Sequence, residues 1–335
     1  MTHPSILFPL AVLAVAAVAP LGAASGAGFL VVANKGDHTV GFIDTESGIQ
    51  VATVEEGGVT GHELTASPDG RTIYVPIYGN SGVGKPGTDG QTMVVIDAAS
   101  RKVTGRFDFG KGVRPHCAVF DAKNNLLYVT TELEQAITAI DPASLRVVGK
   151  IPTGQAESHM LAITRDGRRG YTANVGPGTV SVLDLAARKL ITVIPVSGET
   201  QRIALSVDDK LVFTADQKKP QLAVIDTATN KLTTWVALPA TGYGTSPTPD
   251  GRWLLVAVPA TRQVAVVDLK SMKVARTIDV PAAPQEVLVR PDGRVAYVSC
   301  DASGKVAAID TSTWKVERVM DAGKSVDGLA WVAGK

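Results

Sequence analysis

The sequence predicts an all-β fold, a seven-bladed β-propeller with four antiparallel strands in each blade. The first observation is a repeated phrase, an aliphatic residue followed by aspartate, which occurs at Asp44, Asp97, Asp141, Asp184, Asp226, Asp268 and Asp310. Successive copies are about 42 to 53 residues apart, and a period of roughly 40–45 residues with several strands per unit is typical of propellers. The second is that each unit divides into four short strands. The third is that the two ends of the chain complete one unit.

One unit can be followed between residues 168 and 206. Four segments have side chains that alternate between the two faces of a half-buried sheet, as β-strands do. These segments are residues 170–174, 179–183, 189–194 and 202–206. Gly176-Pro177-Gly178 turns the chain between the first two. Each unit therefore predicts one four-stranded blade.

The repeated aspartates have two interpretations. An aspartate in every blade resembles a calcium-binding or catalytic feature, but each one ends a strand where a hairpin turn is expected. Aspartate side chains accept hydrogen bonds from the backbone of such turns, so we expect a structural role. Pro-Asp-Gly at 68–70, 249–251 and 291–293 predicts further tight turns, with proline presetting φ and glycine taking the left-handed position.

The two ends of the chain predict closure of the ring. Residues 29–34 align with the second strand of a unit, whereas residues 328–332 align with the first. The C-terminal strand should therefore complete the first blade and remove a free edge. We expect one propeller domain over residues 28–335.

Residues 1–27 resemble a secretory signal peptide. An apolar run at 6–19 is followed by small residues, which favour cleavage after Ala24 or Ala27, although no Lys or Arg precedes the run. The alternative is a retained anchor, but the run is short for a membrane span and Pro9 and Pro20 interrupt it. We expect a periplasmic or secreted protein with no membrane span after cleavage.

Charge and cysteine content exclude some functions. The formal net charge is +1, which provides no basic field for general nucleic-acid binding. The two cysteines, Cys117 and Cys300, fall in different repeats, and we expect them to be buried and unbridged.

The strand motifs resemble the YVTN family of β-propeller repeats. Tyr128-Val129-Thr130-Thr131 is the closest copy, and Tyr171-Thr172-Ala173-Asn174 and Tyr297-Val298-Ser299-Cys300 are looser. The resemblance covers essentially the whole mature chain and implies a seven-bladed, extracytoplasmic protein. Members of that family have different activities, so it says little about function.

Three of the five histidines share one repeat position. His62, His116 and His159 each stand where the innermost strand of a blade begins, in three consecutive blades. The other blades place Gln201, Tyr243, Gln285 and Asp327 there. Three imidazoles with an open position are a ligand set for a divalent transition metal such as zinc, copper, nickel or iron. The alternative is a polar channel lined by solvated histidines.

A glycine-rich insertion at residues 79–90 joins the second and third strands of the blade that carries His62. This connection opens on the same face as the histidines, so we expect the insertion to cover them; a tolerated surface insertion is the alternative. The further ligand-binding candidates on this rim are Lys85, Arg114, Glu157, Arg202, Tyr243, Glu286 and Asp327, with Glu63 beside them. Each of these alone is also explained as a solvated rim residue.

Together these features favour an exported binding module whose channel face takes a metal, a small-molecule ligand or a protein partner. One alternative is a metal-assisted hydrolase, lactonase or lyase, which needs a metal-bound water or a histidine placed as general base. Another is a periplasmic accessory protein for a redox cofactor or metalloenzyme. We expect a monomer.

Overall fold

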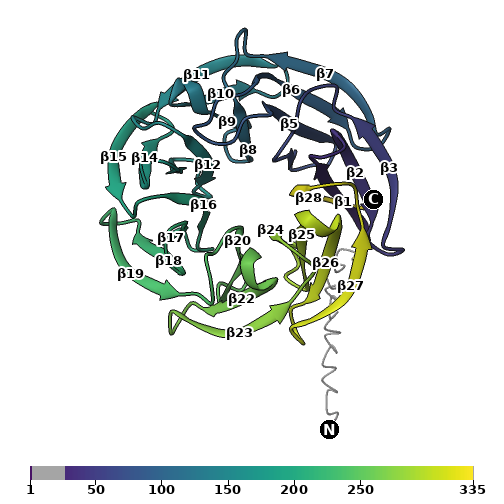
Figure 1. Cartoon of the computed structure of the whole chain (residues 1–335), viewed down its shortest axis with the longest axis vertical. Helices are drawn as coiled ribbons and strands as arrows, with labels where there is room; N and C mark the ends of the chain where they lie inside the picture. The colour runs from purple at the N-terminus through teal and green to yellow at the C-terminus, as the bar shows by residue number, and fades with distance from the viewer. Residues whose placement is uncertain (2–26, 335) are drawn as a thin grey trace.

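The computed structural model describes Met1 and residues 27–334, and its strands form seven four-stranded antiparallel sheets arranged around a central axis (Figure 1). The predicted seven-bladed propeller is confirmed. In six of these seven sheets the four strands pair in sequence order from the channel outwards, and in the remaining sheet the C-terminal strand is innermost and pairs with the first strand of the chain. The signal-peptide prediction concerns residues 1–27 and lies almost wholly outside the described residues.

The strands have the following bounds. Blade one contains β28 (Val326–Ala333), β1 (Gly28–Asn34), β2 (Thr39–Asp44) and β3 (Ile49–Glu55). Blade two contains β4 (Thr65–Ala66), β5 (Thr72–Gly79), β6 (Asp89–Asp97) and β7 (Lys102–Asp108). Blade three contains β8 (Pro115–Asp121), β9 (Leu126–Thr131), β10 (Ala136–Asp141) and β11 (Arg146–Pro152). Blade four contains β12 (Ser158–Ile163), β13 (Arg169–Asn174), β14 (Thr179–Asp184) and β15 (Lys189–Pro195).

Blade five contains β16 (Thr200–Leu205), β17 (Leu211–Asp216), β18 (Gln221–Asp226) and β19 (Lys231–Ala237). Blade six contains β20 (Thr245–Pro247), β21 (Trp253–Val258), β22 (Gln263–Asp268) and β23 (Lys273–Asp279). Blade seven contains β24 (Pro284–Val289), β25 (Val295–Cys300), β26 (Lys305–Asp310) and β27 (Lys315–Asp321). Three single-turn 3₁₀ helices follow second strands: η1 (Glu132–Glu134), η2 (Pro259–Thr261) and η3 (Asp301–Ser303).

The C-terminal strand closes the first blade, as the sequence predicts. β28 pairs with β1, with Leu30 opposite Trp331, so blade one combines both ends of the chain. At the channel, the Gly328 amide donates to the His62 carbonyl across the boundary between blades one and two, at 2.9 Å. A Cβ at Gly328 would lie 2.7 Å from the Glu63 Cα, so this close approach requires glycine.

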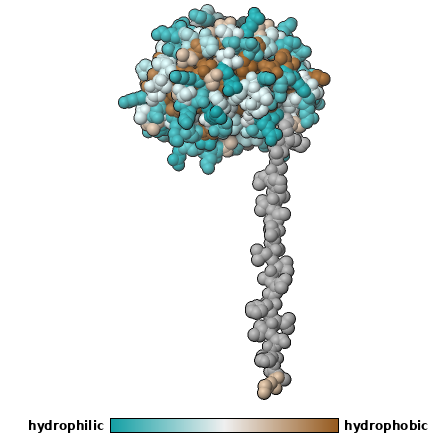
Figure 2. Space-filling model, turned by 90° about the horizontal axis from the view of Figure 1, so that it is seen from below, coloured by the Kyte–Doolittle hydropathy of each residue, from teal (hydrophilic) through white to brown (hydrophobic). Residues whose placement is uncertain are grey.

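The hydrophobic core is distributed between the blades. Seven clusters of buried side chains each join two neighbouring sheets, and the cluster containing Val31 and Ile73, for example, links blades one and two. Seen from the side, the surface is mainly hydrophilic, with a narrow hydrophobic strip (Figure 2). Because every blade packs on two others, the ring holds the inner strands in a fixed relation around the channel.

The repeated aspartates are turn residues. Asp44 accepts a hydrogen bond from the Ser47 amide at 2.7 Å, and Asp184 accepts one from Ala187 at the same distance. Asp97, Asp141, Asp226, Asp268 and Asp310 make equivalent contacts. These bonds lower the pKa of Asp44, whose partners are the amide and hydroxyl of Ser47. The structural interpretation is confirmed.

Candidate functional site

The three histidines meet at one mouth of the channel. The ring centroids of His62 and His116 are 5.4 Å apart, and those of His116 and His159 are 3.5 Å apart. A common backbone turn directs them inwards, because the residue two positions before each has a positive φ. These residues are Thr60 (68°), Arg114 (51°) and Glu157 (54°). The shared repeat position therefore gives a shared place in space.

Burial favours the neutral form of the His62 and His116 imidazoles. His116 and His159 are 2% and 3% exposed. Burial lowers the pKa of His116 well below its ordinary value and the pKa of His62 to about 3. Neither His116 Nδ1 nor His159 Nδ1 has a hydrogen-bond partner. Neutral imidazole is the form that binds metals, so the Nδ1 of His116 is available to a ligand.

A second group of side chains surrounds the histidines. The Tyr78 hydroxyl, at the end of β5, donates to Glu132 Oε2 at 2.5 Å, and the Tyr78 ring lies 5.0 to 5.7 Å from all three imidazoles. Glu132 Oε2 is also 3.5 Å from His159 Nδ1. Burial and the hydrogen bond to Glu132 raise the pKa of Tyr78, so the phenol stays protonated.

The glycine-rich insertion lies against this group. Arg114 Nη2 donates to the Lys85 carbonyl at 2.7 Å, and Arg114 Nε donates to Asp89 at the same distance. Arg114 Nη1 donates to Glu132 at 3.2 Å, which links the insertion to the histidine neighbourhood. A Cβ added at Gly84, whose φ is +64°, would collide with the Glu157 carboxylate. The loop 80–88 thus packs beside the mouth.

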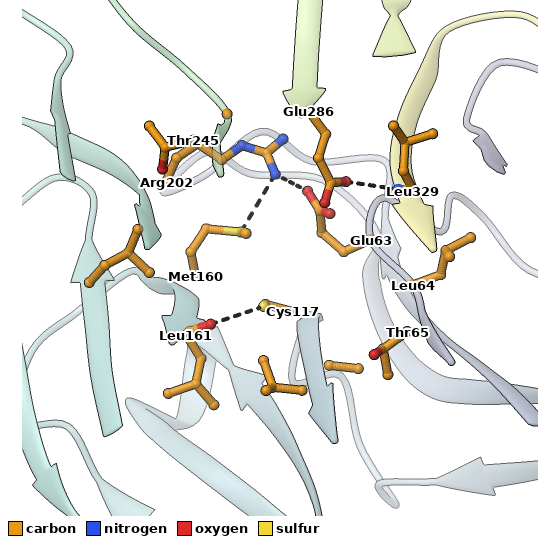
Figure 3. Close-up of a pocket in the computed structure, with 14 residues that line it drawn as sticks. Glu63, Leu64, Thr65, Cys117, Met160, Leu161, Arg202, Thr245, Glu286 and Leu329 are labelled. Carbon is orange, nitrogen blue, oxygen red and sulfur yellow. Dashed lines mark hydrogen bonds and ion pairs between the residues drawn. The ribbon is translucent and has the colours of Figure 1, made fainter. Parts of the chain in front are cut away.

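Buried charges line the channel near the histidines, and Figure 3 shows two of them, Arg202 and Glu63. Arg202 pairs with Glu63 and, at 3.0 Å, with Asp327, and its guanidinium lies 4.5 Å from the Tyr243 ring centroid. Lys35 also contacts Asp327, at 3.0 Å. Burial alone would raise the pKa of Asp327, but the charges of Arg202 and Lys35 outweigh it and lower that pKa.

Glu63 and Glu286 form a pair of buried carboxyl groups in the same part of the channel. Burial raises the pKa of Glu63 and raises that of Glu286 well above its ordinary value, and the two carboxyl groups interact. Glu286 Oε2 accepts from the Leu329 amide at 2.8 Å. A cavity of about 240 Å³ beside these groups is lined partly by Cys117, Met160 and Leu161 (Figure 3).

Three of the predicted rim residues are buried and not solvated. Arg114, Arg202 and Asp327 are 3% to 5% exposed, each in an ion pair. The Glu157 carboxylate accepts a hydrogen bond from the Gly176 amide at 2.7 Å. The Lys85 side chain is exposed. The solvated alternative is therefore wrong for Arg114, Arg202 and Asp327. Cys117 and Cys300 are both buried and unbridged, as expected.

Sequence reasoning missed Lys35, Tyr78 and Glu132. Lys35 and Glu132 occupy the same repeat position, directly after the second strand of their blades. A search of that position would have found both, whereas Tyr78 carries no such signal. Across residues 27–334, no helix is long and apolar enough to cross a membrane.

The geometry stops short of a formed metal site. Within the part of the chain that the structure describes, no group of three or more His, Cys, Asp or Glu side chains is arranged to hold a metal ion. His116 and His159 stack with only 30° between their planes. Two ligands of one tetrahedral ion must instead point at a common centre.

Comparison with known proteins identifies the family. Residues 121–331 match the family described as the cytochrome D1 heme domain, so the chain belongs to that family. His159 lies inside the matched segment, whereas His62, His116 and the loop 80–88 lie outside it. The YVTN resemblance remains an interpretation of the strand motifs.

Solved structures agree on the fold. Hydrazine synthase of Kuenenia stuttgartiensis has a TM-score of 0.74 at 19% identity, covering 85% of this chain and 93% of that one. A functionally unknown protein from Desulfotomaculum acetoxidans also scores 0.74, at 14% identity, covering 92% and 100%. No curated protein matches the sequence.

A haem does not fit the two cavities at the channel. The 240 Å³ cavity contains sulfur groups but lies below the roughly 300–1,000 Å³ typical of organic-ligand pockets. The other, about 360 Å³ beside the loop, is lined by Gly84, Lys85, Pro86, Arg114, Glu132, Leu133, Gln135, Ala156 and Glu157. None of these residue types is an ordinary axial ligand of haem iron.

Proposed function

We propose that this protein is an exported binding module that takes a divalent transition-metal ion directly on His62, His116 and His159. The observation that carries the proposal is the buried, unpartnered Nδ1 atom of His116, which lies between the imidazoles of His62 and His159. Buried polar atoms normally have partners, and exceptions often indicate an unseen ion or water. Imidazole nitrogens favour zinc, copper, nickel and iron over magnesium or calcium.

The stacked arrangement is compatible with a site that forms on metal binding. His62 and His116 already stand with ring centroids 5.4 Å apart and planes 71° apart, a spacing that lets both rings address one ion. A rotation of His159 away from His116 would complete the set. The low pKa of His62 means that no proton has to be displaced from that ring at neutral pH.

Metal analysis of the purified protein tests the proposal. We expect about one equivalent of a transition metal per chain, or an increase in the melting temperature when zinc, copper, nickel or cobalt is added. His38→Ala is the matched control, because His38 is exposed. A chain without metal, whose melting temperature is unaffected by all four ions, overturns the proposal. Export is tested separately, by an exported form that begins near Ser25 or Gly28.

A metal-assisted hydrolase or lactonase is a second candidate. The observation that favours it is the Glu63–Glu286 carboxyl pair beside the 240 Å³ cavity, because burial raises the pKa of Glu286 well above its ordinary value and a carboxyl group with a raised pKa can act as a general acid. A panel of lactones and esters, assayed with and without chelator, separates the two candidates. Chelator-sensitive turnover supports the enzyme, and binding without turnover supports the module.

A further inference from the structure

We propose that Glu132 is the positioning residue of the histidine site and also fastens the loop 80–88 beside it, so that metal occupancy and loop closure are coupled. This inference rests on the proposed metal-binding function and adds its regulation. Glu132 is 3% exposed and begins η1, directly after β9. Its two carboxylate oxygens face two different parts of the molecule.

One oxygen faces His159. Glu132 Oε2 lies 3.5 Å from His159 Nδ1, which is longer than the roughly 2.7–3.2 Å of an N–H···O hydrogen bond. A carboxylate that accepts from Nδ1–H fixes the imidazole tautomer and leaves Nε2 free for a metal. The Tyr78 hydroxyl, 2.5 Å from the same oxygen, holds the carboxylate in place.

A rotation of His159 towards Glu132 would serve both this contact and metal binding. The His159 ring stacks on the His116 ring, with ring centroids 3.5 Å apart. Movement of His159 off His116 and towards Glu132 would turn the long contact into a hydrogen bond. It would also separate the two imidazoles, which now stack on one another. Metal binding and the His159–Glu132 bond therefore favour one another.

The other oxygen faces the loop. Gly84 N–H donates to Glu132 Oε1 at 3.4 Å, and Arg114 Nη1 donates to it at 3.2 Å. Arg114 in turn donates to the Lys85 carbonyl and to Asp89, both at 2.7 Å. Residues 84 and 85 and the start of β6 are thus held by one buried carboxylate and its arginine partner.

The charge of Glu132 matters to both contacts. Its carboxylate attracts a cation and compensates Arg114, whose Nη1 lies 3.2 Å from Oε1. Loss of such an outer partner typically costs roughly 10- to 100-fold in metal affinity.

The test compares Glu132→Gln with Glu134→Gln in the full chain. Glu134 lies on the same 3₁₀ helix but pairs with Lys111 and Lys150, away from the loop. Affinities for zinc and cobalt are measured by calorimetry, the visible spectrum of bound cobalt reports its coordination, and hydrogen exchange reports on residues 80–88. Tyr78→Phe, which removes the hydroxyl but keeps the carboxylate, is the second variant if Glu132→Gln fails to fold.

We expect zinc to slow exchange in the wild-type loop. Glu132→Gln should bind zinc and cobalt roughly 10- to 100-fold more weakly, alter the cobalt spectrum and lose the zinc-dependent protection. Glu134→Gln should behave as wild type, and Tyr78→Phe should show a smaller loss. If wild type binds neither ion, the metal site and this inference fail together. If wild type binds zinc and Glu132→Gln matches it in affinity and loop exchange, this inference alone is overturned.

Discussion

His116 and His159 belong to neighbouring blades, yet their imidazoles stack with ring centroids 3.5 Å apart, and neither Nδ1 has a hydrogen-bond partner. An unsatisfied buried polar group costs about 1–3 kcal/mol of folding free energy. A metal that binds His116 Nδ1, together with a hydrogen bond from His159 Nδ1 to Glu132, would recover that cost. The pair is therefore a place where binding and stability are linked.

The first prediction concerns His116→Ala. This variant should lose most of its zinc affinity, because His116 stands between the other two imidazoles and two remaining ligands hold an ion poorly. In wild type, zinc at a hundred- to a thousandfold above its dissociation constant should stabilise the fold by roughly 3–4 kcal/mol. Thermal unfolding with and without zinc measures both effects. Unchanged stabilisation by zinc in His116→Ala would contradict the assignment of this ligand.

The second prediction concerns pH. Burial lowers the pKa of His62 to about 3 and that of His116 well below its ordinary value, whereas both titrate near 6.5 in the unfolded chain. The unfolded chain therefore binds more protons below pH 6.5. The contribution of His62 and His116 to the free energy of unfolding is complete above pH 6.5. As the pH decreases below that value, the free energy of unfolding falls by about 1.4 kcal/mol per pH unit for each histidine.

Glu63 and Glu286 act in the opposite direction, because their pKa values are raised and their contribution is lost as the pH rises. The effect of the two histidines is therefore measured by comparing wild type with a variant in which both are replaced. His62→Gln combined with His116→Gln should show a weaker decline in unfolding free energy between pH 6.5 and 5 than wild type. Urea unfolding at each pH measures the slope, and parallel slopes would mean that these histidines are not buried in neutral form.

The sequence predicts the fold well because its repeat is a property of the backbone. The aspartate turns and the hydrophobic alternation recur in every blade, so the strands and the closure by residues 328–332 follow from periodicity alone. The convergence of the three histidines followed for the same reason. Their shared repeat position leads to a shared place at the channel mouth.

The contacts within the site were not predictable in the same way. Tyr78 and Glu132 belong to different blades, and only folding brings the hydroxyl within 2.5 Å of the carboxylate. The burial of Arg202 likewise depends on Glu63 and Asp327, which lie far away in the sequence. Periodicity places each residue on its own blade but does not state how charges pair across the channel.

The third prediction concerns closure. Deletion of Ser325 to Lys335 removes β28 and leaves β1 as an unpaired inner strand. The loss should amount to several kcal/mol, comparable with the total stability of a domain. We expect a much lower melting temperature or aggregation, measured by circular dichroism and light scattering. Deletion of Gly334 and Lys335 alone, which lie beyond β28, is the control; equal melting of the two truncated forms would refute the closure argument.

The last prediction concerns the charges in the channel. Arg202→Met leaves Glu63 without its cation in a buried place, and breaking such a pair typically costs about 3–5 kcal/mol. Arg202→Met combined with Glu63→Gln should recover most of that loss, because the uncompensated charge is gone while the Lys35–Asp327 pair remains. Equilibrium unfolding in urea gives the three free energies.

Arg165→Met is the control for the loss of an arginine as such. Arg165 pairs with Asp209 on the surface, where its side chain is 67% exposed, and an exposed pair contributes about 0–1 kcal/mol. If Arg202→Met costs no more than Arg165→Met, the channel is hydrated enough to solvate Glu63. A large loss that is recovered when Glu63→Gln is added would instead show that the channel around Arg202 is dry, and that Arg202 is needed there to hold the carboxylates of separate blades together.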